Sequence, residues 1–160
     1  MTNNIITLTK TEENDLNSFF EFQLDEEAIN LAGFTPKDPG DKTAYIEKYT
    51  KHLNDPAINN QTIKVDGVIA GSIAKFVIEG DAEITYWIDK KFWGKGIATT
   101  ALKELLKIEK VRPIFARVAF DNIGSQKVLE KCGFEKIGKD KGFANARQAV
   151  IEDYIYKLSD

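Results

Sequence analysis

Two glycines stand at the junction between an expected strand and an expected helix. They lie in the segment WGKGIAT at 93–99, which four residues separate from the strand candidate 83–88. Glycine lets the backbone turn with its N–H groups pointing outward, and it lets a ligand approach closely. The first N–H groups of a helix lack intrahelical partners, and the helix dipole adds positive potential. The segment therefore predicts an anion site that suits a pyrophosphate, with Lys95 adding positive charge.

The same glycines have a plainer interpretation as a tight turn. The segment is not a P-loop, which requires G-x-x-x-x-G-K-[ST]. It is not a dinucleotide-binding fingerprint either, because Thr99 stands where the third glycine of G-x-G-x-x-G would be. The following helix has an apolar face in which Ile97, Ala101 and Leu105 recur. Taken alone, the glycine pair does not decide between a turn and an anion site.

A second segment, NIGSQKVLEKCGF at 122–134, follows after one expected strand. Asn122 is a good helix N-cap, and Gly133 is a good residue to end a helix. A short capped helix is a complete explanation of this pattern, so the segment alone indicates no function.

Together the two segments resemble the GNAT superfamily of N-acetyltransferases. The first is similar to that family's acetyl-CoA loop, [Q/R]-x-x-G-x-[G/A], and the second to its N-x-x-[S/A] helix ending in Gly-Phe. The resemblance covers roughly residues 61–158, while the helical front half matches in layout. Trp93, Ser125 and the phrase FWGKGIATTAL resemble the RimJ/RimL-like branch, which acetylates ribosomal-protein N-termini.

This resemblance implies acetyl-CoA as co-substrate. Backbone N–H groups of 94–99 would hold the pyrophosphate, and the end of strand 83–88 would splay from its neighbour to pair with the pantetheine arm. A backbone N–H near Ile88 would polarise the thioester carbonyl, Asn122 would contact the arm and Ser125 would lie near the sulfur. The implied cofactor contacts are Tyr86, Trp87, Ile88, Trp93, Gly94, Lys95, Gly96, Ile97, Ala98, Thr99, Asn122 and Ser125.

The general base and the acid are less directly indicated. Glu83 is the candidate base because it opens the strand that lines the expected cleft, although a solvated strand-end carboxylate explains it equally well. Asp89, Asp140 and Asp153 are weaker candidates, and Asp89 also suits a turn. Many GNAT enzymes carry an acid Tyr seven residues after the Asn, but Leu129 occupies that position here. Ser125 is the expected substitute, as a hydrogen-bond donor to the sulfur.

The resulting hypothesis is direct transfer, in a ternary complex, of an acetyl group from acetyl-CoA to a primary amine. A protein N-terminal α-amine is favoured, since its pKa of ~7.7–8.0 lies well below the ~10.4 of a lysine amine. A polyamine or aminoglycoside is the chief rival, with mild support from the acidic balance of the chain. An alternative of another class is a non-catalytic acyl-CoA-binding module, because the Tyr is missing at Leu129.

The order of elements predicts an α/β (α+β type) fold, with a GNAT-like, mostly antiparallel central sheet, splayed central strands and flanking helices. One domain over 1–160 is expected. The sequence predicts a strand at 5–9, helices starting at Thr11, ending at Gly33 and capped by Asp41, a hairpin of 61–65 with 68–78, a strand at 83–88, a helix at 97–110, a strand at 114–119, a helix at 122–132 and strands near 134–137 and 149–158.

Composition excludes several classes. Hydrophobic residues make up 42% and charged residues 29%, as in ordinary globular proteins. A single cysteine excludes an internal disulfide. With only one cysteine and one histidine, the sequence suggests no metal site. The net charge of −3 argues against nucleic-acid binding, and no apolar run approaches the roughly 20 residues that span a membrane. No signal peptide is recognisable, so a cytoplasmic protein is expected. The oligomeric state is open, with a homodimer as one option.

Overall fold

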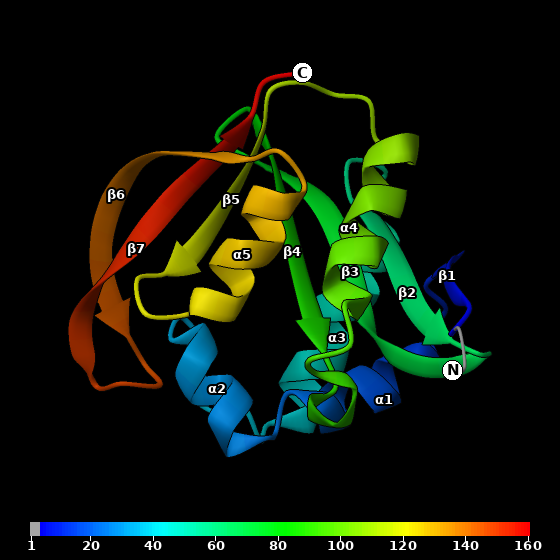
Figure 1. Ribbon diagram of the computed structural model, residues 1–160. Helices are drawn as coiled ribbons and strands as arrows, with labels where there is room; N and C mark the ends of the chain where they lie inside the picture. Colours follow the sequence, from blue (N-terminus) through cyan, green and yellow to red (C-terminus); the bar gives the residue numbers. More distant parts are fainter. Residues whose placement is uncertain (1–3) are drawn as a thin grey trace.

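A computed structural model describes residues 4–160 as a seven-stranded sheet with helices packed on it (Figure 1). The strand order is β1-β2-β3-β4-β5-β7-β6, and every neighbouring pair is antiparallel except β4 with β5. The strands are β1 (Ile6–Lys10), β2 (Asn59–Val65), β3 (Val68–Ile78), β4 (Asp81–Ile88), β5 (Ile114–Ala119), β6 (Glu135–Ala144) and β7 (Ala149–Leu158). The helices are α1 (Asp15–Phe22), α2 (Glu26–Ala32), α3 (Lys42–Leu53), α4 (Ile97–Ile108) and α5 (Ile123–Lys131), with a 3-10 turn η1 (Lys90–Phe92). The predicted mixed, mostly antiparallel fold is confirmed.

Local turn and cap signals account for many of the element ends. The β2–β3 hairpin turns at Asp66 and Gly67, both of which have positive φ, as a two-residue hairpin of this kind requires. Gly33 ends α2 with a φ of 73°. Asp41 caps α3 by accepting a hydrogen bond from the N–H of Ala44 at 3.0 Å. These boundaries follow the sequence prediction.

The first helix starts later than the sequence predicts. Thr11 is buried, and its hydroxyl lies 3.0 Å from the Thr62 hydroxyl of β2 instead of capping a helix. Thr62 also donates to the Asp15 carboxylate at 2.8 Å, and that carboxylate accepts the N–H of Glu12 at 3.0 Å. These contacts with β2 hold residues 11–14 in a turn, so the helix begins at Asp15.

The sixth strand is longer than the predicted 134–137. β6 runs from Glu135 to Ala144 and pairs with β7 along its length, with an irregularity between Lys136 and Gly138. Glycines at 138 and 142 weaken the local strand signal. The continuous ladder with β7 overrides that weakness, and the turn between β6 and β7 reaches α2.

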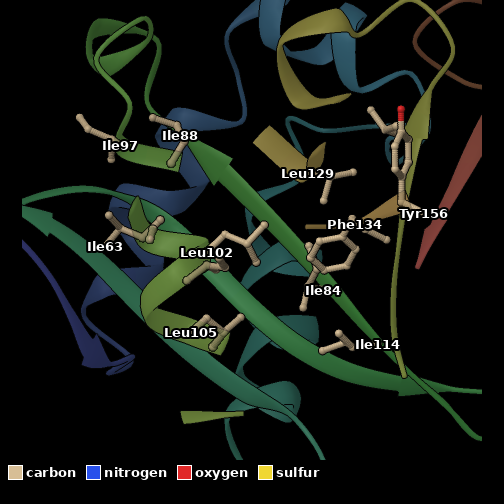
Figure 2. Close-up of a cluster of buried hydrophobic side chains, with 14 of the residues drawn as sticks. Ile63, Ile84, Ile88, Ile97, Leu102, Leu105, Ile114, Leu129, Phe134 and Tyr156 are labelled. Carbon is tan, nitrogen blue, oxygen red and sulfur yellow. The ribbon is translucent and has the colours of Figure 1, made fainter. Parts of the chain in front are cut away.

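The main core lies between the sheet and helices α4 and α5. Figure 2 shows Leu102 and Leu105 of α4 facing Ile63 of β2 and Ile84 of β4. Leu129, Phe134 and Tyr156 continue the same core under α5. Helices α1, α2 and α3 gather near the C-terminal end of β4 (Figure 1). Within residues 4–160 no helix combines the length and apolarity needed to cross a membrane.

The two central strands separate partway along their length. β4 and β5 are parallel, and they pair only at Ala82 with Ile114 and at Glu83 with Phe115. Beyond Glu83 the rest of β4 has a backbone edge that β5 does not cover. Backbone N–H and C=O groups need partners, so such an edge is available to a ligand that runs alongside it. This is the splayed pair that the family resemblance implied.

Candidate active site

The loop between β4 and α4 is shaped by two glycines in left-handed conformations. Gly94 has a φ of 75° and Gly96 a φ of 74°, which residues with side chains rarely adopt. Gly96 is the N-cap of α4 and makes no side-chain hydrogen bond. A Cβ added at either glycine would meet no atom within 4 Å, so the space above the loop is open. A helix start beneath an open cradle suits an anion, because its first N–H groups lack intrahelical partners.

A hydrogen bond from Trp93 holds this loop against the end of β4. Its indole N–H donates to the carbonyl oxygen of Ile88 at 2.9 Å. The N–H of Asp89 donates in the other direction, to the carbonyl of Ala70 at the β3 side, at 2.8 Å. Because backbone groups of successive strand residues point to opposite edges, the N–H of Ile88 faces the edge that β5 leaves uncovered.

A cavity of about 680 Å³ lies over this loop. It is walled by the end of β4, the start of α4, the first turns of α5 and part of α2. All of the expected cofactor contacts line it except Lys95, whose ammonium lies 5.7 Å from the ring centroid of Phe92. Lys127 and Lys131 line the cavity in its place. Their i, i+4 spacing puts them on one face of α5, a signal that the sequence analysis overlooked.

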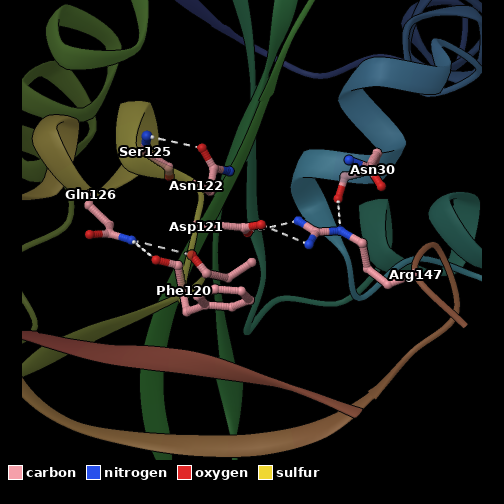
Figure 3. Close-up of polar contacts among 8 residues, drawn as sticks. Asn30, Phe120, Asp121, Asn122, Ser125, Gln126 and Arg147 are labelled. Carbon is pink, nitrogen blue, oxygen red and sulfur yellow. Dashed lines mark hydrogen bonds and ion pairs between the residues drawn. The ribbon is translucent and has the colours of Figure 1, made fainter. Parts of the chain in front are cut away.

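Helix α5 starts beside the open edge of β4. Asn122 is its N-cap and accepts a hydrogen bond from the N–H of Ser125 at 3.3 Å (Figure 3). Gly133 follows the helix with a φ of 90°, a conformation that favours glycine. The capping interpretation of this segment is therefore confirmed, and the same caps place Ser125 in the first turn of α5.

A second cavity of about 630 Å³ lies where α1 and α3 cover the sheet, and the β6–β7 ribbon forms part of its wall. Leu129 is 1% exposed and lines it, so no hydrogen-bond donor occupies that position. The rings of Tyr45 and Tyr49 lie 4.4 Å apart between centroids. Burial raises the pKa of both hydroxyls, which therefore stay protonated at neutral pH. Other aromatic lining residues are Phe19, Phe22, Phe34, Tyr86 and Trp87.

The positive and negative charges that line this second cavity nearly cancel. Arg117 donates to Asp140 and to Asp153, both at 3.3 Å, and Asp153 is buried. Lys48 and Lys141 are the remaining charged lining residues. Three cations therefore face two carboxylates, which is a poor environment for a ligand with several positive charges.

The two cavities meet at the end of β4. Both are lined by Ala32, Tyr86, Trp87, Asn122 and Ser125. A ligand in the first cavity and a ligand in the second would touch each other there. This arrangement can bring two substrates together for direct group transfer.

The side chain of Tyr86 forms part of this meeting point, a role that the sequence analysis missed. Its hydroxyl oxygen lies 2.5 Å from the hydroxyl oxygen of Ser125. Burial raises the pKa of Tyr86 to about 12. The sequence prediction concerned only the backbone of Tyr86, because nothing local indicates that its side chain points toward α5.

Glu83 lies in the paired half of β4, away from that meeting point. Its register partners are Phe76 on β3 and Phe115 on β5, and it lines neither cavity. Tyr86 lies three positions further along the strand, about 10 Å away at ~3.3 Å per residue. Burial raises the pKa of the Glu83 carboxyl, with Arg117 acting against this shift. Its role as the base stays a prediction.

Arg147, on the β6–β7 turn, forms hydrogen bonds with α2 and with the residue that precedes the N-cap of α5 (Figure 3). Its guanidinium donates to both carboxylate oxygens of Asp121, each at 2.8 Å, and to the carbonyl of Asn30 in α2 at 2.6 Å. This pairing holds the pKa of Asp121 below its ordinary value. Because Asp121 precedes Asn122, the ribbon and α2 are both anchored to the start of α5.

Cys132, the lone cysteine, is a poor candidate for a nucleophile in this site. The thiol of Cys132 lies 3.6 Å from the carbonyl of Thr99, and burial raises its pKa. A half-buried thiol with a raised pKa is a poor nucleophile. No cluster of His, Cys, Asp and Glu suited to a metal ion occurs within residues 4–160.

Known proteins with related sequences are N-acetyltransferases by name. The acetyltransferase (GNAT) domain family matches residues 6–135. An uncharacterized N-acetyltransferase, p20 of Bacillus licheniformis, is 26% identical over 166 residues, covering 96% of this chain and 92% of that protein.

Solved structures show the same fold. RimL, a ribosomal L7/L12 α-N-protein acetyltransferase in complex with coenzyme A, superposes with a TM-score of 0.84 at 18% identity, covering 96% of this chain and 93% of the other. A spermidine N-acetyltransferase from Vibrio cholerae with CoA and spermine gives 0.78 at 20% identity, covering 96% and 95%. With the family match over most of its length, this chain belongs to the GNAT acetyltransferases and is an acetyl-CoA-dependent N-acetyltransferase.

Proposed function

We propose that this enzyme acetylates the α-amine at the N-terminus of a protein or peptide, by direct attack of that amine on acetyl-CoA. The observation that carries the proposal is that positive and negative charges nearly cancel in the second cavity, where Arg117 forms ion pairs with both Asp140 and Asp153. A peptide N-terminus brings one positive charge and a neutral backbone, whereas a polyamine brings several charges that need several free carboxylates.

The first cavity takes acetyl-CoA in this proposal. The diphosphate would sit on the N–H groups of 94–99, with Lys127 and Lys131 supplying positive charge to the phosphates. The pantetheine arm would run along the uncovered edge of β4, within reach of Asn122. The orientation of the Ile88 N–H toward that edge supports its role as donor to the thioester carbonyl.

The acceptor amine would enter through the second cavity and meet the thioester beside Ser125. An α-amine of pKa ~7.7–8.0 is substantially neutral at pH 7.5, whereas a lysine amine at ~10.4 is almost entirely protonated. Direct attack by an α-amine therefore requires little help from a base. This fits a cavity in which both carboxylates, Asp140 and Asp153, are already paired with Arg117.

Mass spectrometry of acetyl transfer to matched acceptors tests this proposal. The panel contains a peptide with a free N-terminus and an internal Lys, the same peptide with a blocked N-terminus, and spermidine. We expect one acetyl group on the free N-terminus, and a kcat/KM at least tenfold above that of spermidine or of the blocked peptide, a gap of about 1.4 kcal/mol. Preferred transfer to spermidine would instead support the polyamine alternative, for which the Vibrio cholerae neighbour is the precedent.

A cytoplasmic location and a homodimeric state complete the proposal. The single cysteine suits a reducing compartment. The mass measured by light scattering at working concentration decides the oligomeric state.

A further inference from the structure

Tyr86 and Ser125 leave one hydroxyl proton unused where the two cavities meet. Each hydroxyl carries one proton and can also accept a hydrogen bond. The single bond between them consumes one of the two protons. Within residues 4–160 neither hydroxyl has another hydrogen-bond partner. One O–H is therefore left to be donated to a bound substrate.

The surroundings favour the arrangement in which Tyr86 is the donor to Ser125. Tyr86 lies on the face of β4 that carries the buried Ile84 and Ile88, so its ring is held against the core. Its raised pKa, from burial, keeps the hydroxyl protonated. Ser125 lies in the first turn of α5, where the positive end of the helix dipole favours negative charge nearby. The free proton is then the one on Ser125.

We propose that the Tyr86 hydroxyl is a positioning residue, which turns the Ser125 O–H toward the sulfur of acetyl-CoA. The pair thereby supplies the donor that Leu129 cannot. The inference rests on the proposed function, because it assumes that acetyl-CoA occupies the first cavity.

The step balances without any further reactant. The amine nitrogen forms a bond to the carbonyl carbon, the C–S bond breaks, and its electron pair stays on sulfur. The nitrogen releases a proton to water. Ser125 donates a hydrogen bond to the thiolate, while Tyr86 donates to Ser125 and fixes its direction. Hydrogen bonds to charged groups contribute roughly 1.5–3 kcal/mol, so the pair matters most as the thiolate forms.

A double-mutant cycle on kcat tests the coupling. We expect Tyr86→Phe and Ser125→Ala each to lower kcat roughly tenfold or more with little change in the KM for acetyl-CoA. The double variant should be no slower than Ser125→Ala alone, because Tyr86 acts through Ser125. Tyr154→Phe is the matched control, since it also removes a hydroxyl from a partly buried ring but lies outside both cavities.

A binding measurement separates this inference from the proposed function. Wild-type affinity for CoA relative to desulfo-CoA should rise between pH 6.5 and 8.5, because a thiolate-stabilising site lowers the pKa of the bound thiol below ~8.5. Tyr86→Phe and Ser125→Ala should flatten that rise. The desulfo analogue cancels the titration of the other groups around the cavities, which are Tyr45, Lys48, Tyr49, Arg117, Asp121, Lys127, Lys131, Cys132, Asp140, Lys141 and Asp153.

Different failures have different meanings. If wild-type protein bound neither CoA nor desulfo-CoA, the placement of the cofactor would be wrong, and this inference with it. If both bound normally but Tyr86→Phe kept wild-type kcat and the same pH-dependent preference, the positioning role would be excluded. Multiplicative losses in the double variant would also exclude it, because they would show that the two hydroxyls act independently.

Discussion

The two cavities of this enzyme are built in opposite ways. The first cavity, which we propose as the cofactor side, is shaped mainly by main-chain features: a loop with positive φ at Gly94 and Gly96, a helix start and an uncovered strand edge. The second cavity, which we propose as the acceptor side, is lined by side chains from α1, α3, β5, β6 and β7. The first cavity is therefore centred on one stretch of chain, 86–99, with α2 and α5 completing its wall, whereas the second is assembled from many segments that are far apart.

This difference explains what each side can tolerate. A main-chain site depends on conformation and open space, so almost any residue that fills the space disables it. A side-chain site depends on particular groups, so single substitutions there change the preference for acceptors more than they destroy binding. Paired substitutions, one in each cavity, test whether this contrast holds.

The largest effect is expected from filling the cofactor loop with Gly96→Trp. The added side chain has no protein atom near its Cβ, so it would occupy the cradle itself. We expect acetyl-CoA affinity, measured by calorimetry, to fall roughly hundredfold, equivalent to about 2.7 kcal/mol.

Gly67→Trp is the control for backbone strain. Gly67 also has a positive φ of 83° and open space around its Cβ, but it lies on the β2–β3 turn and lines neither cavity. Both variants should lose about 1–2 kcal/mol of stability, because a residue with a side chain is strained in the left-handed backbone conformation. If Gly67→Trp weakened acetyl-CoA binding as strongly as Gly96→Trp does, strain would explain the loss and the loop would not be the binding site.

The contrast also shows why sequence patterns predicted one side better than the other. The glycines at 94 and 96 act through their own backbone, so their signal is local, and the loop, α4 and α5 were predicted with their caps. The splayed strands came from the family resemblance. The contact of Tyr86 with Ser125 depends on how α5 packs beside β4, and the contact of Arg117 with Asp153 depends on the pairing of β5 with β7; no local pattern encodes either. The late start of α1 has the same cause, since Thr62 of β2 holds the turn at 11–14.

On the acceptor side the largest effect is expected from Asp153→Asn. Asp153 is buried and accepts a hydrogen bond from Arg117, so the variant leaves the cavity more positive. We expect the KM for the amine to rise about tenfold, in keeping with the 1.5–3 kcal/mol of a charged hydrogen bond. Acetyl-CoA affinity should not change.

Asp140→Asn is the matched comparison, because Asp140 pairs with the same Arg117 from a mostly exposed position. Solvent screening should make its effect clearly smaller. Steady-state kinetics with the peptide acceptor measure both. A parallel loss of acetyl-CoA affinity in Asp153→Asn would contradict the separation of the two sides.

Arg147→Met should affect both sides modestly, since Arg147 links the ribbon and α2 to the residue before Asn122. We expect roughly threefold higher KM values for both substrates and a stability loss of about 1–2 kcal/mol, as for a bidentate charged contact. Asp121 has a lowered pKa when folded, so this stabilisation is present at neutral pH and is lost as the pH falls through that pKa. Thermal melts at pH 7.5 and pH 3.5 check the sign. Lys139→Met, which breaks the exposed pair with Glu152, should change neither value.

The smallest effect is expected from Glu83→Gln, which tests the predicted base. Because Glu83 lines neither cavity, we expect kcat to change less than about threefold, against the 10²–10⁴-fold that loss of a general base typically costs.

The melting temperature of Glu83→Gln provides a second, independent test. The folded-state pKa of Glu83 is raised, so the ionised form destabilises the fold, and that penalty develops as the pH rises through the unfolded and folded pKa values. Glu83→Gln should therefore melt at a higher temperature than wild type at pH 7.5, with the difference shrinking below pH 4. A kcat loss of a hundredfold, with an acid limb in the wild-type pH profile that the variant lacks, would instead place Glu83 in the reaction through intervening water. The acceptor side would then extend along β4 well past the point where its strands part.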